Sequence, residues 1–260
     1  MSLRRKLFYA FTLAVVMVLL ALPATGWLAR LQLLPFTHPN AIRSWHATVS
    51  SPEAQAERYE NDMKKAITAS GGDFTLRYAH ALSGNSADVV RQLERLGDSY
   101  PEDPRIHAAT LRYMTVGPVQ VKRPEERMLA PDSPVPGRDK PIDPSAVAKF
   151  DAHARRGEAA DPQNAYFPVM AAIGYFASGQ DDKAIAAWIR AGNKPGWKEY
   201  TVDDVTTRWE LQRAMNNGTE VGSIARMSSM AAILFPHYAS LRASARMATV
   251  KALQAELAGE

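Results

Sequence analysis

From Asp161 to Pro195 the chain reads DPQNAYFPVMAAIGYFASGQDDKAIAAWIRAGNKP, and this segment indicates its fold most clearly. A mostly apolar run comes first, Gly179 lies in a short polar break, and a second run follows with apolar residues three and four apart. This spacing is typical of amphipathic helices, and glycine commonly ends a helix because it readily takes a positive φ. The stretch therefore predicts a helical hairpin, with helices over Gln163–Ala177 and Asp182–Ala191.

Four expected helix starts share one chemistry. Proline follows a residue with a side-chain oxygen at Ser51-Pro52, Asp103-Pro104, Asp143-Pro144 and Asp161-Pro162. The oxygen can accept a hydrogen bond from a free N–H group of the first helical turn, and proline suits that turn because its missing N–H would have no partner there. We therefore expect a helix to begin at each of these four places.

Helical spacing extends along most of the remaining chain. Further helices are expected from Ser51 to the glycines at 71–72, over Phe74–Leu82, around Val89–Leu96 and Ile106–Met114, and over Ser145–Ala160, Val202–Met215, Thr219–Leu234 and Pro236–Leu257. Strands facing a core on one side would alternate apolar and polar residues, and the sequence has no convincing segment of that kind. The predicted fold class is all-α.

The hairpin resembles a tetratricopeptide repeat (TPR), a helix–turn–helix unit of about 34 residues. With Ala165 as the first position, the small, aromatic and turn positions of the family fall on suitable residues. These repeat-packing positions are Ala172, Tyr175, Gly179, Ala184, Trp188 and Ala191. There are two departures: Pro168 stands where the family favours tryptophan, and the closing proline, Pro195, comes one residue early.

The resemblance implies both a fold and a binding surface. TPR arrays are antiparallel helical hairpins stacked into an α-solenoid, and they bind peptides along the concave face of their first helices. The corresponding groove candidates here are Tyr166, Val169, Ile173 and Phe176. All four are apolar, so the groove would suit an amphipathic helix. The alternative is that the next helix or an insertion covers them, because contiguous exposed apolar patches are uncommon.

The chain divides into five expected segments. A membrane anchor or signal segment (1–30) and a linker (31–50) come first, and degenerate hairpins (51–116) follow, with Gly84 as a turn glycine. A proline-rich insertion (117–144) interrupts the helical pattern, and loops of this length are usually functional or disordered. The TPR-like repeat and the C-terminal helices (145–260) complete the chain.

Residues 1–30 predict a membrane helix. Three cations precede the apolar run that begins at Leu7, and continuing the run to Ala29 gives about 35 Å of helix, enough for a hydrocarbon core of about 30 Å. Cations before the helix favour a cytoplasmic N-terminus, so residues 31–260 are expected outside the cytoplasm, on a single-pass anchor in the cytoplasmic membrane. The alternative is a signal peptide cleaved after Ala24, which would leave a secreted or periplasmic protein.

The basic charge of the chain lies in this first segment. The formal net charge is +4, and residues 1–30 contain Arg4, Arg5, Lys6 and Arg30 without any acidic residue. The other 27 basic residues balance the 27 acidic ones, so we expect no nucleic-acid partner. Because the chain has no cysteine, disulfides, thiolate metal sites and cysteine nucleophiles are excluded.

The sequence contains no recognisable catalytic or metal-binding motif. The six histidines form no H-E-x-x-H pattern, and neither G-x-S-x-G nor a phosphate-binding glycine loop occurs. We therefore expect no catalytic residue, metal or cofactor, and a non-enzymatic scaffold that holds a protein or peptide partner at a bacterial-type membrane. Two alternatives stay open. One is a cell-envelope hydrolase that would use Glu125, Glu126 and His153, and the other is a subunit that completes a homo-oligomer.

Overall fold

The computed structural model describes residues 51–121, 142–220 and 237–259, together with residues 12, 15, 222, 226 and 230. The chain divides into two compact units, 1–62 and 63–260. Within the described residues the secondary structure is helical, with no strand and one isolated β-bridge between Asn164 and Gly196. The all-α class is therefore confirmed.

In the first unit, the described residues are few. Thr12 and Val15 are helical, and the other residues of the expected anchor lie outside the described ranges. Helix α4 (Pro52–Ala69) begins in this unit after Ser51, whose hydroxyl oxygen accepts a hydrogen bond from Ala54 N at 3.3 Å. Among the residues that the structure describes, no helix has the length and apolar content needed to cross a membrane.

Eight further helices are described in the second unit. They are α5 (Phe74–Ala81), α6 (Ser86–Ser99), α7 (Pro104–Val116), α9 (Pro144–Ala160), α10 (Tyr166–Ala177), α11 (Asp181–Gly192), α12 (Thr201–Met215) and α14 (Tyr238–Ala258). The predicted caps of α7 and α9 are confirmed, because Asp103 accepts from Arg105 N at 3.0 Å and Asp143 accepts from Ser145 N at 2.8 Å.

The helix start predicted at Asp161 is wrong. Asp161 follows the end of α9, and α10 begins only at Tyr166. The residues between them pair with the segment before α12, since Ala165 N donates to Gly196 O at 2.7 Å and Gly196 N donates to Gln163 O at 3.1 Å. These long-range hydrogen bonds hold the chain out of helical conformation.

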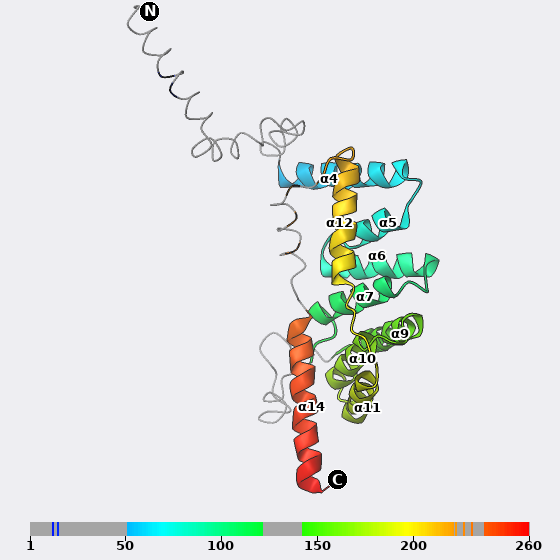
Figure 1. Cartoon of the computed structure of the whole chain (residues 1–260), viewed down its shortest axis with the longest axis vertical. Helices are drawn as coiled ribbons and strands as arrows, with labels where there is room; N and C mark the ends of the chain where they lie inside the picture. Colours follow the sequence, from blue (N-terminus) through cyan, green and yellow to red (C-terminus); the bar gives the residue numbers. More distant parts are fainter. Residues whose placement is uncertain are drawn as a thin grey trace, which may run out of the picture. The chain divides into compact units, whose positions relative to one another are not determined.

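Helices that follow one another in sequence pack together through much of this unit (Figure 1). Contacts join α5 to α6, α6 to α7, α7 to α9, α9 to α10 and α10 to α11. Two later helices return to earlier ones: α12 packs against α5, and α14 packs against α10 and α11. The result is a packed helical array that is compatible with a helical-repeat fold.

Helix α10 forms the centre of the largest core. The groove candidates Tyr166, Val169, Ile173 and Phe176 are at most 3% exposed, so none of them presents an open surface in this structure. Helices α9, α11 and α14 pack around α10, and Val119 and Val121 from the start of the insertion join the same core. These neighbours therefore cover the four groove candidates, which is the alternative to an open groove.

Two glycines bring α9 and α10 close together. A Cβ atom added at Gly157 would lie 2.1 Å from a ring carbon of Phe167, and one added at Gly174 would lie 2.8 Å from a ring carbon of Phe150. Each helix therefore offers a glycine to an aromatic ring of the other. This reciprocal packing fixes how α9 lies against α10.

The region between α12 and α14 was expected to be helical over Thr219–Leu234. Thr219 and Glu220 are not helical, whereas Arg226 and Met230 are. Most of that range and residues 122–141 of the insertion lie outside the described residues.

Candidate functional site

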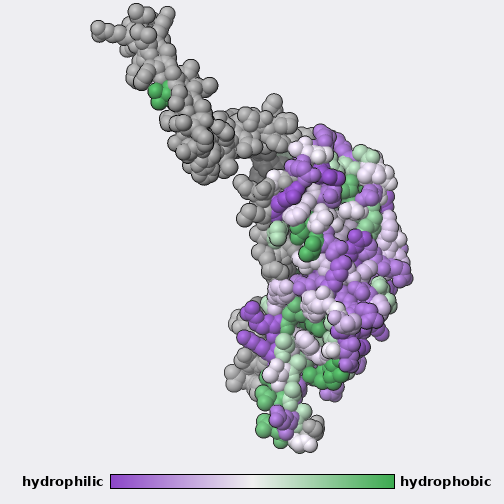
Figure 2. Space-filling view, viewed as in Figure 1, coloured by the Kyte–Doolittle hydropathy of each residue, from purple (hydrophilic) through white to green (hydrophobic). Residues whose placement is uncertain are grey.

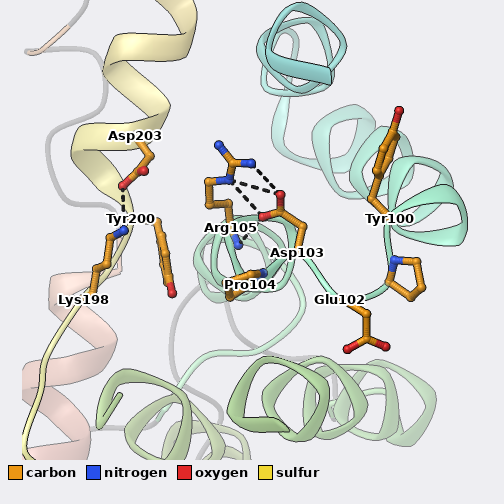
Figure 3. Close-up of a pocket in the computed structure, with 9 residues that line it drawn as sticks. Tyr100, Glu102, Asp103, Pro104, Arg105, Lys198, Tyr200 and Asp203 are labelled. Atoms are coloured by element: carbon orange, nitrogen blue, oxygen red, sulfur yellow. Dashed lines mark hydrogen bonds and ion pairs between the residues drawn. The ribbon is translucent and has the colours of Figure 1, made fainter. Parts of the chain in front are cut away.

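A surface pocket lies between the turn that leads into α7 and the segment that leads into α12 (Figure 3). Its volume is about 710 Å³. One wall, here called the α7 wall, consists of residues 100–105, and the other, the α12 wall, contributes Lys198, Tyr200 and Asp203. Tyrosine and proline side chains supply apolar surface, and charged groups stand beside them. Binding sites commonly combine apolar surface with a few placed polar groups in this way.

The cations of the pocket are paired with acids of the same wall. Arg105 Nη2 lies 2.6 Å from Asp103 Oδ2, and the hydrogen bonds that Arg105 donates to this carboxylate raise the pKa of Arg105. On the α12 wall, Lys198 Nζ lies 3.6 Å from Asp203 Oδ2 and 4.3 Å from the centre of the Tyr200 ring. Arg105 is thereby oriented by its acid, and Lys198 lies beside both Asp203 and the Tyr200 ring.

A buried polar network lies behind both walls. The side chains of Arg112 on α7 and Asp204 on α12 form an ion pair and are each 4% exposed. The Tyr78 hydroxyl on α5 lies 2.6 Å from Asp204 Oδ1 and 3.0 Å from Arg105 O, while Arg112 donates to the carbonyl of Glu199. Burial raises the pKa of Asp204, and the charge of Arg112 opposes that effect. The network fixes α5, α7 and α12 relative to one another.

Glu199, between two residues of the α12 wall, connects that wall to α14. Its carboxylate lies 2.9 Å from His237 Nε2 and accepts from Tyr238 Oη at 3.0 Å and Trp197 Nε1 at 3.2 Å. The hydrogen bond from His237 is the main cause that lowers the pKa of Glu199 to about 2. His237 is 1% exposed, and its Nδ1 has no hydrogen-bond partner among the described residues. The His237 ring is buried and neither residue of the pair lines the pocket, so this carboxylate–histidine pair joins the α12 wall to the start of α14.

A histidine pair joins the α7 wall to α9. His107 Nδ1 lies 3.1 Å from His153 Nδ1, and the two residues are 1% and 8% exposed. The other ring nitrogen of His107, Nε2, lies 2.8 Å from the carbonyl oxygen of Pro101. Burial lowers the pKa of both rings, and for His153 the neighbouring His107 and Arg156 add to the effect and bring the pKa to about 4.

The predicted repeat-packing residues lie in and around the α10–α11 hairpin. Ala172, Ala184 and Ala191 are at most 4% exposed. Gly179 has a φ of 76° in the turn between the two helices, a conformation that favours glycine. The two aromatic residues extend to neighbouring helices, since Tyr175 Oη donates to Asp151 of α9 at 2.6 Å and Trp188 Nε1 donates to Ser244 of α14 at 3.1 Å.

Of the three residues proposed for a hydrolase, only His153 lies within the described residues. Glu125 and Glu126 lie outside them, and His153 is buried against His107. Among the residues described, no group of three or more histidine, aspartate or glutamate side chains could hold a metal ion.

Sequence reasoning missed the buried groups because their partners are distant in the chain. His107 and His153 are 46 positions apart, and Arg112 and Asp204 are 92 apart. One signal was present: Arg112 lies within the largely uncharged helical run IHAATLRYMTV, where a lone cation on a core helix points to a buried partner. Nothing in the sequence identified which acid that partner would be.

Comparison with protein-family models, with curated proteins and with solved structures finds no match to this chain. The function therefore has to follow from the geometry of the pocket and of the groups that support it.

Proposed function

We propose that this protein is a non-catalytic, TPR-like scaffold that binds a segment of a partner protein in the pocket between the α7 and α12 walls. Its N-terminal segment would hold it at the cytoplasmic membrane, with the helical array outside the cytoplasm. The TPR-like hairpin over α10 and α11 supports the repeat assignment, and residues 1–30 support the anchor.

The observation that carries this proposal is the preorganisation of the pocket. Both walls rest on the Tyr78–Arg112–Asp204 network, and each cation at the pocket surface lies beside an acid of its own wall. A rigid site loses little conformational entropy when a ligand binds, which favours recognition. Catalytic sites instead need ionisable groups converging on a substrate. On the α12 wall, burial and the hydrogen bond to Asp161 raise the pKa of Tyr200, whereas the lowered pKa of His153 belongs to a buried pair behind the pocket.

The chemistry of the pocket favours a polypeptide segment over a strongly charged small molecule. Tyr100, Pro101, Pro104 and Tyr200 offer ring surface for apolar or proline side chains. Three carboxylates and two cations line the pocket, and the excess acid is Glu102, an exposed residue. A mostly apolar segment with a basic residue would therefore complement the site.

A photo-crosslinking experiment tests this proposal. The amino acid benzoylphenylalanine would replace Glu102 at the pocket, or Ile189 on α11 as a control, because Ile189 is 64% exposed and does not line the pocket. Both full-length chains would be expressed in their native host and irradiated in intact cells, and covalent adducts would be identified by mass spectrometry.

We expect a partner that crosslinks from position 102 and not from position 189. Adducts that are the same from both positions would contradict specific binding at the pocket, and so would adducts from position 189 alone. A crosslink that maps within the partner to a segment with basic and apolar residues would support the chemistry proposed above.

One observation favours the alternative function, a subunit that completes a homo-oligomer. Leu253 and Leu257, one turn apart near the end of α14, are 52% and 86% exposed. Figure 2 shows hydrophobic groups on this end of the helix, whereas hydrophilic groups dominate much of the visible face. Sedimentation equilibrium of the full chain and of a Leu253→Glu/Leu257→Glu variant would separate the two functions. Dissociation by the variant supports a subunit role, and an unchanged monomer opposes it.

A further inference from the structure

The two hydrogen-bonded histidines have a fixed arrangement of protons. The carbonyl oxygen of Pro101 can only accept, so His107 Nε2, 2.8 Å away, must carry a hydrogen. In neutral His107, Nδ1 is then an acceptor. His153 Nδ1, 3.1 Å from it, must therefore be the donor. Neutral rings fit the site in this one combination of tautomers.

Protons added to the pair act against this arrangement in two steps. A first proton can leave the bond between the two Nδ1 atoms in place, but it puts a positive charge in a buried contact between α7 and α9. A second proton, on His107 Nδ1, leaves two N–H groups facing each other without an acceptor. Each step weakens the contact between the helices, because burial penalises the charge and the second step removes the hydrogen bond.

The charged groups around the pair come from both sides. On α9, Arg156 and Lys149 disfavour a further positive charge, and on the α7 side Glu102 and Asp103 favour it. Lys149 is itself paired with Glu94 of α6 at 3.2 Å. Helix α10, which also packs on α9, carries no charged side chain over its length. Burial outweighs the two acids, so the pair stays neutral at neutral pH.

The pair is connected directly to the pocket. Pro101, which accepts the hydrogen bond from His107, lines the α7 wall, and Asp103, the N-cap of α7, lines the same wall one helical turn before His107. The α12 wall is joined to α7 farther along that helix, by the Arg112–Asp204 ion pair and the hydrogen bond from Arg112 to Glu199 O, and to α14 by the Glu199 carboxylate. Pro101 is held by His107 and not by these contacts, so a displacement of His107 from His153 would move the Pro101 end of the α7 wall relative to the α12 wall.

We propose that the His107–His153 pair is a proton-operated coupling between α9 and the pocket, in which acidification separates the two rings and displaces the α7 wall. The pocket is then formed at neutral pH and altered in acid. The consequence for binding rests on the proposed function, whereas the movement itself can be measured without a partner.

Spin-label distances across the pocket test the movement. The chain has no cysteine, so Ser99→Cys at the end of α6 and Val202→Cys at the start of α12 would be the only labelling sites, and both positions are exposed. Distances between nitroxide labels on the full-length chain would be measured by pulsed electron–electron double resonance from about pH 7.5 to about pH 3.5. This range includes the ordinary histidine pKa of about 6.5. Circular dichroism at each pH would monitor the fold.

We expect one distance population at neutral pH and a second one that grows in acid, with a midpoint below the ordinary histidine pKa and with the helical signal retained. Exposed carboxylates also titrate near about pH 4, so a His153→Asn variant is needed to separate their effect. Asparagine keeps a donor near the position of Nδ1 and cannot take up the proton, so the second population should be absent. His80→Asn, a histidine change on α5, should behave as the wild type.

Two results would overturn the coupling: wild-type distances that do not change over this range, or the same change in His153→Asn. If His153→Asn does not fold, side-chain NMR of ¹³C-labelled histidine in the wild type decides the matter. Rings at 107 and 153 that titrate at the ordinary value and leave the distances unchanged contradict the proposal. A failure here with successful crosslinking at neutral pH would leave the binding function intact.

Discussion

At the scale of single residues, His153 makes the stability of the fold depend on pH. Its native pKa is about 4, below the value of 6.5 expected in the unfolded chain, so between these values the unfolded state binds more protons. Stability is therefore full above about pH 6.5 and decreases as the pH falls toward 4. The shift corresponds to about 3 kcal/mol. Urea unfolding at a series of pH values would measure the loss, and His153→Asn should lack most of it. An equal loss in the variant would show that other groups cause the effect.

Tyr78 provides a second test at this scale. Its hydroxyl is buried and lies 2.6 Å from Asp204, so Tyr78→Phe leaves a buried carboxylate with one donor fewer. We expect the free energy of unfolding to fall by about 1.5–3 kcal/mol, the usual range for a hydrogen bond to a charged group. Tyr100→Phe is the matched control, because Tyr100 is only partly buried and packs by its ring against Phe74. Chemical denaturation of both variants makes the comparison, and equal stabilities would contradict the role of the network.

Residue roles could be predicted where they are local. Asp103 and Asp143 cap helices as expected because the cap and the N–H group that it accepts from are two positions apart. Asp161 has the same sequence context, but its carboxylate accepts from Tyr200 Oη at 2.5 Å and from Asn164. The partner of Asp161 is therefore a residue 39 positions away, and the Asp-Pro pattern at a helix start carries no information about such a distant contact.

At the scale of helices, the α9–α10 contact depends on Gly157. A methyl group there would collide with the Phe167 ring, so Gly157→Ala should destabilise the protein by about 1–3 kcal/mol through overpacking. Gly97 on α6 is the control, because a Cβ atom there would meet Ile106 at an ordinary 3.5 Å. Gly97→Ala should be neutral or stabilising by up to about 1 kcal/mol, since alanine favours helix more than glycine does. Thermal unfolding of both variants measures the difference, and a Gly157→Ala variant as stable as Gly97→Ala would contradict the packing.

Helix existence could be predicted more fully than helix partners. Periodic apolar spacing identified the α10–α11 hairpin and the helices before it, because this signal lies within each segment. The groove candidates on α10 required knowledge of what covers them. That covering comes partly from α14, about 70 positions later in the chain, and spacing within α10 cannot reveal it. The pocket was missed for the same reason, since its walls come from residues 100–105 and 198–203.

At the scale of the whole molecule, the proposed membrane location depends on residues 1–30. If they form an uncleaved anchor, the full chain should stay with membranes after alkaline extraction, and a variant that lacks them should become soluble. Their apolar length and the preceding cations are the physical reasons. Fractionation followed by N-terminal sequencing tests both parts. A mature chain that begins at Thr25 would show cleavage after Ala24 and contradict the anchor.

Calorimetry of the purified full chain with the crosslinked partner at neutral pH shows whether that partner binds in the pocket. The pocket variant Glu102→Lys/Lys198→Glu would be compared with a control, Glu256→Lys/Arg95→Glu, on exposed positions away from the pocket; neither variant changes the net charge. We expect the pocket variant to keep its fold and to bind at least about tenfold more weakly, a loss of about 1.4 kcal/mol, while the control binds like the wild type. Equal affinity for all three proteins would show that the partner binds elsewhere and would contradict binding in this pocket.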